Sequence, residues 1–407
     1  MKMAFKLKSS QFAYVITAYV TLFCLGLLDN ARGPFFADIM RDLQLNNWQG
    51  SLFYAVSSML AYFTGVRVAH WAHRFGTINV LRMGQVSMGF GFAAIATAHS
   101  LPTLLIFCAA FGSGFGLINV AQNFLILESA SGALRRRLFS GLHGMYAFAS
   151  LIAPLICAEL FRGGRDWRFG FIAFASTLII AFGLSFIAKN HKLPKQISPE
   201  VSTDILTDIS TRSELEPSML KKYFWLLILI SFYTLAEIAL TTRLSLFLRI
   251  EKGFAPADAA NWLAYFFVAM LFGRVVFLIF HFHWRTNQII LVSLVLSLIL
   301  FSLGLKFHVG FLLLCGVTLG PIFGLCLDHI AELHPNAAHE AVSYMIAKSG
   351  LFIVTMHLLT GVLSDAIGIG KALALGPLYL LIASVALLKV NRAHRATARK
   401  PSLAVKN

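Results

Sequence analysis

Glu237 is the ionisable residue whose position is hardest to explain by structure alone. It lies about halfway along an apolar segment over residues 223–249, which the sequence predicts to be a membrane-spanning helix. At 1.5 Å per residue it is roughly 20 Å from either end, too deep for its side chain to reach water. A charge there costs on the order of 2.5–3.5 kcal/mol, whereas a buried carboxyl group can exchange a proton near neutral pH. With Tyr233 and Thr241 one turn away on either side, we expect Glu237 to carry a proton; a structural hydrogen bond is the alternative.

Asp29 is the second candidate proton carrier. It lies in the outer third of a predicted helix over residues 12–38, three positions before Arg32, so that the two side chains can neutralise each other. Gly33 and Pro34 follow directly and would loosen the helix, freeing backbone groups to line a cavity. The sequence leaves open whether Asp29 handles protons or only forms a structural pair with Arg32.

Three amide side chains share one face of a helix predicted over residues 102–128. Asn119, Gln122 and Asn123 fall at positions i, i+3 and i+4 on a segment with few other polar groups. They could contact a hydroxylated or otherwise polar solute. The alternative is hydrogen bonding that holds this helix to its neighbours.

Two further helices carry polar residues at matching places. His143 and Tyr146 lie on one face of a helix predicted over residues 138–162. Lys348, in a later predicted helix, has no acid three or four positions away and needs one from elsewhere; Asp328 is the expected partner. A single histidine in a membrane helix is more often a packed hydrogen bonder than a proton relay.

These patterns give two sets of candidate residues besides the proton carriers Glu237 and Asp29. The residues expected to contact the solute are Asn30, Arg32, Asn119, Gln122, Asn123, His143, Tyr146, Tyr233 and Lys348. The residues expected to act in gating or structure are Arg74, Gly76, Arg274 and Asp328.

The composition excludes an ordinary soluble protein. The mean hydropathy is +0.75, with 58% hydrophobic and only 13% charged residues, and apolar segments of 18 or more residues recur along the chain. All five cysteines fall within such segments without metal-ligand spacing, and no phosphate-loop motif occurs. We therefore expect no metal, no cofactor, no catalytic residues and no enzymatic activity. The net charge of +16 is explained by the loops and not by nucleic-acid binding.

Lys and Arg indicate the orientation of the helices. We predict twelve spans, over residues 12–38, 47–72, 79–98, 102–128, 138–162, 166–189, 223–249, 259–282, 286–306, 309–333, 340–363 and 369–390. If the termini are cytoplasmic, 21 of the 34 Lys and Arg residues fall on the cytoplasmic side and eight outside. Residues near a span end are counted with the adjacent side, and the remaining five lie deeper within the spans: Arg32, Arg67, Arg243, Arg274 and Lys348. The positive-inside rule therefore places both termini in the cytoplasm.

The chain divides at one long polar stretch. Residues 190–222 form a predicted cytoplasmic linker between six-helix halves over residues 1–189 and 223–393, and residues 394–407 form a basic cytoplasmic tail. Glycine-rich segments recur at corresponding places in the fourth and tenth spans, so that the halves look like diverged copies. Internal repeats of this kind are typical of secondary transporters.

Short motifs now identify a family that the chain resembles. Residues 72–77, Ala-His-Arg-Phe-Gly-Thr, resemble the cytoplasmic G-x-x-x-D-R-x-G-R-R loop of the major facilitator superfamily. Arg74 and Gly76 fit this pattern, but His73 stands where the acid is expected and the basic pair is missing. The resemblance covers the whole chain and implies an all-α integral membrane protein with twelve helices in two pseudo-symmetric halves.

Several stretches resemble the fucose-permease-like branch in particular. They are Asn119-x-x-x-Asn123, His143-Gly144-Met145-Tyr146 with Pro154, Gly273-Arg274, and Gly361-Val362-Leu363-Ser364-Asp365. Members of that branch carry a carboxylate in the first helix, near Asp29 or Asn30, and another at the position of Asn119. The amide at Asn119 implies that any proton coupling here uses another group.

The resulting expectation is a secondary active transporter that moves a small polar solute by alternating access, coupled to protons as a symporter. Its expected setting is the bacterial inner membrane, with the solute, the proton and the lipid bilayer as its partners and a monomer as its state. One alternative is a proton-driven efflux permease for an amphipathic compound, since 37 Phe residues could line an apolar cavity. Another is a receptor or scaffold that does not transport.

Overall fold

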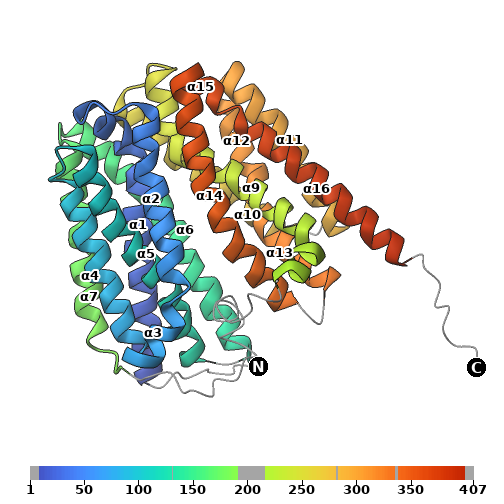
Figure 1. Cartoon of the computed structure of the whole chain (residues 1–407), viewed down its shortest axis with the longest axis horizontal. Helices are drawn as coiled ribbons and strands as arrows, with labels where there is room; N and C mark the ends of the chain where they lie inside the picture. Colours follow the sequence, from blue (N-terminus) through green and yellow to red (C-terminus); the bar gives the residue numbers. More distant parts are fainter. Residues whose placement is uncertain (1–8, 131, 191–215, 281–282, 335–337, 399–407) are drawn as a thin grey trace, which may run out of the picture. The chain divides into compact units, whose positions relative to one another are not determined.

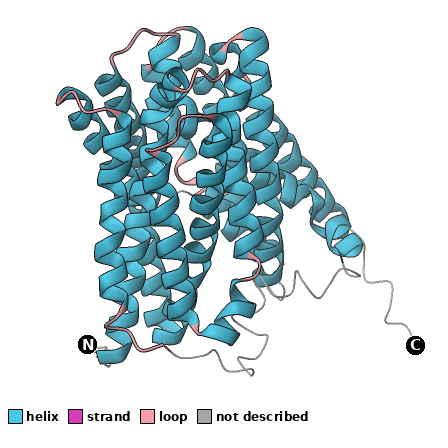
Figure 2. Ribbon diagram, turned by 60° about the vertical axis from the view of Figure 1, so that its left-hand side comes forward, coloured by secondary structure: helices cyan, strands magenta, loops and turns pink. Residues whose placement is uncertain are grey.

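The described part of the chain is helical. The structure is a computed structural model, and it describes residues 9–130, 132–190, 216–280, 283–334 and 338–398. In these ranges the residues form helices joined by short loops, without strands (Figure 2). Most of the predicted linker lies outside the described residues.

Figure 1 shows the order of the helices along the chain. Those before the linker are α1 (Ser9–Asp42), α2 (Asn47–Gly65), α3 (Val68–Phe75), α4 (Thr77–Ile95), α5 (Leu101–Ser129), α6 (Gly132–Arg162) and α7 (Trp167–Ser185). Those after it are α9 (Glu216–Ile250), α10 (Pro256–Ile279), α11 (Thr286–Lys306), α12 (Gly310–Leu319), α13 (Ile322–Leu333), α14 (Ala338–Ile367), α15 (Ile369–Ala372) and α16 (Leu375–Ala398). Every predicted span coincides with one of these helices or with two consecutive ones.

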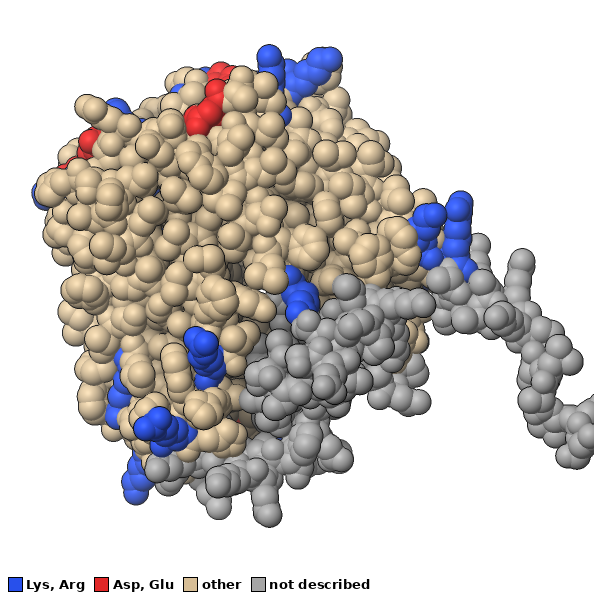
Figure 3. All heavy atoms as spheres, viewed as in Figure 1, with Lys and Arg blue, Asp and Glu red and all other residues tan. Residues whose placement is uncertain are grey.

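The expectation of an all-α membrane protein is confirmed. Among the described residues, ten helical segments are long and apolar enough to cross a membrane, or eleven if α2 and α3, which meet at a 52° bend, count as one span. The predicted span over residues 79–98 corresponds to α4, which is not among them. The exact number of twelve therefore stays a prediction. The face drawn in Figure 3 is formed largely by uncharged residues, as expected of a surface in contact with lipid.

The chain forms two compact units. The first comprises residues 1–211, 239–268 and 353–372, and the second comprises residues 212–238, 269–352 and 373–407. Helices α9, α10 and α14 each contribute a segment to both units. Within the first unit α1 packs against α5, α6 and α7, and α4 packs against α5 and α7. Within the second unit α11 packs against α12, α13 and α16.

Small residues allow α4 and α5 to pack with their backbones close together. A methyl group added to Gly114 of α5 would meet the Met88 nitrogen and the Gly84 carbonyl of α4. Likewise, one added to Gly91 of α4 would meet the backbone of Phe111. Glycine at these positions thus serves close approach, which is the main source of helix association where lipid removes the hydrophobic driving force.

Proline and glycine shape the corresponding region of the second unit. The tenth predicted span is interrupted at Pro321, so that α12 ends at Leu319 and α13 begins at Ile322. Proline has no backbone N–H and leaves the Val317 carbonyl without its helical donor. Gly273 of α10 packs directly against that carbonyl oxygen. Broken helices at membrane depth are tolerated where neighbouring protein satisfies the freed backbone groups.

Gly114→Ala is expected to lower the unfolding temperature of the purified protein in detergent, because the added methyl group would overlap the α4 backbone. Overpacking of this kind costs typically about 1–3 kcal/mol. Gly183→Ala on α7 is the matched control, since a methyl group there meets nothing within 4 Å. Equal losses for the two variants would show that α4 and α5 do not pack through this glycine.

Candidate functional sites

Asp29, Arg32 and Tyr146 form one hydrogen-bonded group within the first unit. The Arg32 guanidinium donates to one Asp29 carboxylate oxygen, and its Nε donates to the Asp29 carbonyl at 3.3 Å. The Tyr146 hydroxyl donates to the other carboxylate oxygen at 2.7 Å. The ion pair forms within α1 because its members are one turn apart, and Tyr146 ties it to α6. The structure thus brings together one predicted proton carrier and two predicted solute contacts.

Asn30 strengthens the same junction between α1 and α6. Its amide donates to the Gly26 carbonyl at 2.8 Å and to the Ser150 hydroxyl oxygen at 3.0 Å. Ser150 in turn donates to the Tyr146 carbonyl at 2.9 Å. Asn30 therefore lies next to the Asp29 group, and both are hydrogen-bonded to side chains of α6.

The Tyr54 ring of α2 has three basic side chains close to it. The Cζ atoms of Arg32 and Arg243 lie 5.1 Å and 4.8 Å from its centroid. The His357 ring stacks on it, with the ring centroids 5.1 Å apart and the planes at 20°. All four side chains are buried. We call these four residues the Tyr54 cluster.

Sequence reasoning did not place Arg243, Tyr54 or His357 at the site, although a signal for Arg243 was present. Arg243 lies within a predicted span and has no acid three or four positions away, the criterion that singled out Lys348. Tyr54 and His357 carry no such signal, because an aromatic residue and a single histidine in a membrane helix usually pack in the core.

Glu237 and Tyr233 form the second candidate group, within the second unit. The Tyr233 hydroxyl donates to the Glu237 carboxylate and also lies 3.3 Å from the Leu319 carbonyl oxygen. Arg274 donates from Nε to the adjacent Gly320 carbonyl at 2.9 Å. The break between α12 and α13 therefore supplies carbonyl groups to both side chains. The polar face predicted for the helix over residues 223–249 and Arg274, predicted to act in gating or structure, therefore meet at one place.

The amides of α5 bond mainly to their own helix. Asn123 donates to the Asn119 carbonyl at 2.8 Å, and Gln122 lies 3.5 Å from the same oxygen. Asn119 is exposed, whereas Gln122 is buried with its carbonyl oxygen unpaired within the described part of the chain. These contacts include none to a neighbouring helix, and their role in solute binding stays a prediction.

The remaining predicted solute and gating residues differ in how exposed their side chains are. His143 of α6 and Asp328 of α13 are exposed, and Lys348 of α14 is half-buried. The proposed pairing of Lys348 with Asp328 stays a prediction.

Gly76 terminates α3 in a conformation that favours glycine. Its φ of +88° is in the left-handed region, and its N–H donates to the Ala72 carbonyl at 2.9 Å. The Asn190 side chain packs against Gly76 and donates to the Phe75 carbonyl at 2.9 Å. Arg74 lies in the last turn of α3, where a basic residue complements the helix dipole. The glycine of the resembled loop motif therefore has a structural reason.

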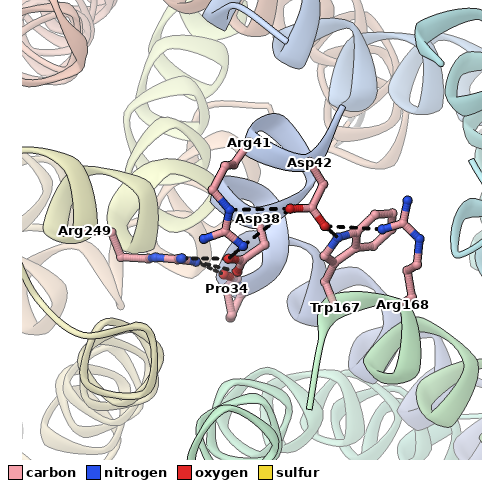
Figure 4. A network of polar contacts seen from close by, with 7 residues as sticks. All are labelled: Pro34, Asp38, Arg41, Asp42, Trp167, Arg168 and Arg249. Atoms are coloured by element: carbon pink, nitrogen blue, oxygen red, sulfur yellow. Dashed lines mark hydrogen bonds and ion pairs between the residues drawn. The ribbon is translucent and has the colours of Figure 1, made fainter. Parts of the chain in front are cut away.

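Asp38 and Arg249 form a buried, bidentate ion pair between α1 and α9 (Figure 4). The two N–H···O distances are 2.6 Å and 2.8 Å, and the side chains are only 10% and 8% exposed for Arg249 and Asp38. Arg41 also approaches Asp38, at 3.1 Å. The neighbouring Asp42 accepts a hydrogen bond from the Trp167 indole at 2.7 Å, which ties this end of α1 to α7.

Asp365 caps the N-terminus of α2 from α14. Its carboxylate accepts from the backbone N–H groups of Asn47 and Trp48 at 2.7 Å and 2.8 Å, and from the Asn47 side chain at 2.9 Å. A helix N-terminus presents unpaired N–H groups that bind a carboxylate well. The two contacts, Asp38–Arg249 and Asp365–Asn47, fasten segments of α9 and α14 to α1 and α2 within the first unit.

Asp38→Asn is expected to lower the unfolding temperature strongly, because it leaves the nearly buried Arg249 guanidinium without its counter-ion. Breaking a buried pair in this way costs typically about 3–5 kcal/mol. The matched control is Glu159→Gln, which breaks the exposed pair with Arg162 and is expected to cost less than about 1 kcal/mol. Thermal unfolding in detergent measures both, and a similar small loss in the two variants would contradict the role of the Asp38 pair.

Comparison with known proteins places this geometry in a family. The model of the Major Facilitator Superfamily matches residues 18–349. The uncharacterized MFS-type transporter Rv0849 of Mycobacterium tuberculosis is 30% identical over 182 residues, 43% of this chain and 41% of that protein. YqjV of Bacillus subtilis, also an uncharacterized MFS-type transporter, is 24% identical over 147 residues, 35% of each chain. The matches thus span well under half of these relatives.

Solved structures show the same fold over nearly the whole length. A bacterial homologue of the human lysosomal transporter Spinster, in an inward-facing and occupied conformation, superposes with a TM-score of 0.75 at 14% identity, covering 95% of this chain and 98% of that one. The nucleoside transporter NupG gives 0.73 at 12% identity, with 93% and 99% covered. The family match and the shared fold agree, and the chain belongs to the major facilitator superfamily of membrane transporters.

Proposed function

We propose that this protein is a secondary active transporter that moves a small polar solute by alternating access and couples this movement to protons as a symporter. The observation that carries the proposal is the Tyr233–Glu237 hydrogen bond beside the broken α12–α13 segment. It provides a titratable group at membrane depth next to backbone that can rearrange. The proposed setting is the inner membrane, with the protein acting as a monomer.

Glu237 and Tyr233 can transmit a change in protonation to the helix break. When Glu237 is ionised, Tyr233 donates its single hydroxyl proton to the carboxylate. A protonated carboxyl group is a weaker acceptor, so the hydroxyl can donate instead to the Leu319 carbonyl, 3.3 Å away. Proton binding would thus be communicated to the junction of α12 and α13, which Arg274 also holds through Gly320.

The Asp29 group supports a polar solute site in the first unit. Asp29, Asn30, Arg32 and Tyr146 together present charged and neutral hydrogen-bonding groups within an apolar bundle. Such groups are costly in a membrane and usually mark a substrate or ion pathway. Asp29 stays the second candidate for the proton.

The orientation rests on the distribution of Lys and Arg. We place both termini and the linker in the cytoplasm because 21 of 34 basic residues then lie on that side. A reporter enzyme that works only in the cytoplasm is expected to be active when it is fused after Asn407. A reporter that works only in the periplasm is expected to be inactive at the same position. A periplasmic signal would reverse the assignment.

The rival functions draw less support from the described residues. An efflux permease would share the Glu237 group but needs a largely apolar site, whereas the Asp29 group is polar. A non-transporting scaffold would have no use for a buried carboxylate at a helix break. The placement within the fucose-permease-like branch rests on the sequence motifs alone.

Glu237→Gln separates proton coupling from solute movement. The variant keeps the size and hydrogen bonding of the side chain but cannot titrate, so we expect normal counterflow in proteoliposomes and loss of accumulation driven by a proton gradient. The solute is one found by thermal-shift screening of sugars, organic acids, amino acids and siderophores. Glu332→Gln on α13, whose side chain is 53% exposed, is the matched control and should behave as wild type. Intact pH-dependent accumulation in Glu237→Gln would remove Glu237 from the mechanism and favour Asp29.

A further inference from the structure

Arg243 is a buried cation without an acidic partner in the described part of the chain. It is 2% exposed and lies seven residues, about 10 Å, before the end of α9. Its Nη2 donates to the Ser51 hydroxyl oxygen at 2.9 Å, and its guanidinium stacks on Phe36 and Tyr54. These are neutral contacts. They hold the guanidinium group in place but do not balance its charge.

Arg32, the second guanidinium group of the Tyr54 cluster, is only partly satisfied. Asp29 occupies its Nε and Nη2, while Nη1 is buried without an acceptor among the described residues. The other two carboxylates on α1 are already held by arginines: Asp38 by Arg249 and Arg41, and Asp42 by Arg41 and Arg168. No second acid of α1 is therefore left to compensate the cluster.

Three nitrogen atoms of the Tyr54 cluster are buried without a hydrogen-bond partner among the described residues. They are Arg32 Nη1, Arg243 Nη1 and His357 Nδ1. The two guanidinium carbons cannot be farther apart than the sum of their distances to the Tyr54 centroid, 5.1 Å and 4.8 Å. Both arginines therefore lie against the same aromatic ring.

We propose that Arg32 and Arg243 bind the anionic group, a carboxylate or a phosphate, of the transported solute. An oxyanion supplies both what the cluster lacks, namely acceptor atoms for the free N–H groups and negative charge. Guanidinium groups bind such anions with planar, paired hydrogen bonds. The aromatic rings of Phe36, Phe53 and Phe111 around the two arginines exclude water and strengthen that attraction.

Stacking or hydration alone explains the cluster less well. Cation–π contacts attract a guanidinium group but do not replace its lost hydrogen bonds. A water molecule would accept from the free N–H groups and still leave the Arg243 charge uncompensated. Ser51, which orients Arg243, is itself held tightly, since any side chain on Gly361 of α14 would meet its hydroxyl oxygen.

The inference deepens the proposed transport function and rests on it, but its test needs no transport. Binding is measured as a thermal shift of the full-length protein in detergent, at ionic strength held constant with potassium chloride. The probes share one carbon skeleton and differ in the terminal group: sorbitol, gluconate and sorbitol 6-phosphate. Succinate with succinamide, and benzoate with benzyl alcohol, vary the body of the molecule. Inorganic phosphate tests the anion alone.

We expect at least one anion to stabilise the wild type while its neutral counterpart does not, and the sorbitol series to tell carboxylate from phosphate. Arg243→Gln and Arg32→Gln should each raise the apparent dissociation constant about tenfold or more, because a charged hydrogen bond is lost. Arg243→Lys keeps the positive charge but loses the paired N–H donors of the guanidinium group, and it should retain weak binding. Arg168→Gln, whose side chain contacts Asp42 outside the cluster, is the matched control.

Three results would overturn the inference: neutral probes that stabilise as well as the anions, no stabilisation by any anion, or anion binding that survives in both glutamine variants. If Arg243→Gln does not elute as a folded protein, Ser51→Ala takes its place, because it removes only the hydroxyl oxygen that accepts from Arg243. Glu237→Gln should keep anion binding. Its loss of accumulation alone would then concern the coupling and not the anion site.

Discussion

The high cost of an uncompensated charge inside a membrane orders most of the polar contacts in this protein. Asp38 is paired with Arg249, Asp29 with Arg32 and Tyr146, and Glu237 with Tyr233. In each case the partner satisfies the group locally, often one helical turn away or across a single helix contact. Within the described residues the Tyr54 cluster differs, because Arg243 receives neutral contacts only and, unlike the carboxyl group of Glu237, a guanidinium group cannot become neutral by exchanging a proton. Because buried charges in a membrane protein are normally compensated, an uncompensated one marks the place where a charged ligand would bind.

Close packing of the backbone positions the helices that carry these charged side chains. Glycines bring α4 and α5 together in the first unit, and Gly273 brings α10 against the carbonyl that Pro321 leaves free in the second. The same helix break provides the Leu319 and Gly320 carbonyls that Tyr233 and Arg274 contact. A local irregularity that would be unfavourable in lipid is thus used to position the proposed proton carrier.

The sequence predicts the helices well because length and hydropathy decide membrane insertion, and each predicted span meets a helix. It predicts contacts within a helix too: Asp29 with Arg32 and Tyr233 with Glu237 follow from a spacing of three or four residues. The sequence does not predict contacts between helices that are far apart along the chain. The Asp38–Arg249 pair and the contacts of Tyr54 with Arg243 and His357 join residues about two hundred or more positions apart, and no spacing rule relates them. The break at Pro321 is likewise visible in the sequence only as a proline in a predicted helix.

Glu237 and Arg243 lie on the same helix, α9, six positions apart in the sequence. In the proposed cycle, the empty carrier has an ionised Glu237 and an Arg243 without an anion, and the loaded carrier has a protonated Glu237 and an anion on Arg243. For a singly charged anion, both states are neutral at these two sites. The half-loaded states, with only the proton or only the anion, carry a net charge. Because a low-dielectric interior disfavours charged states, rearrangement would be easiest when both sites are filled or both are empty, which is the condition for coupled symport.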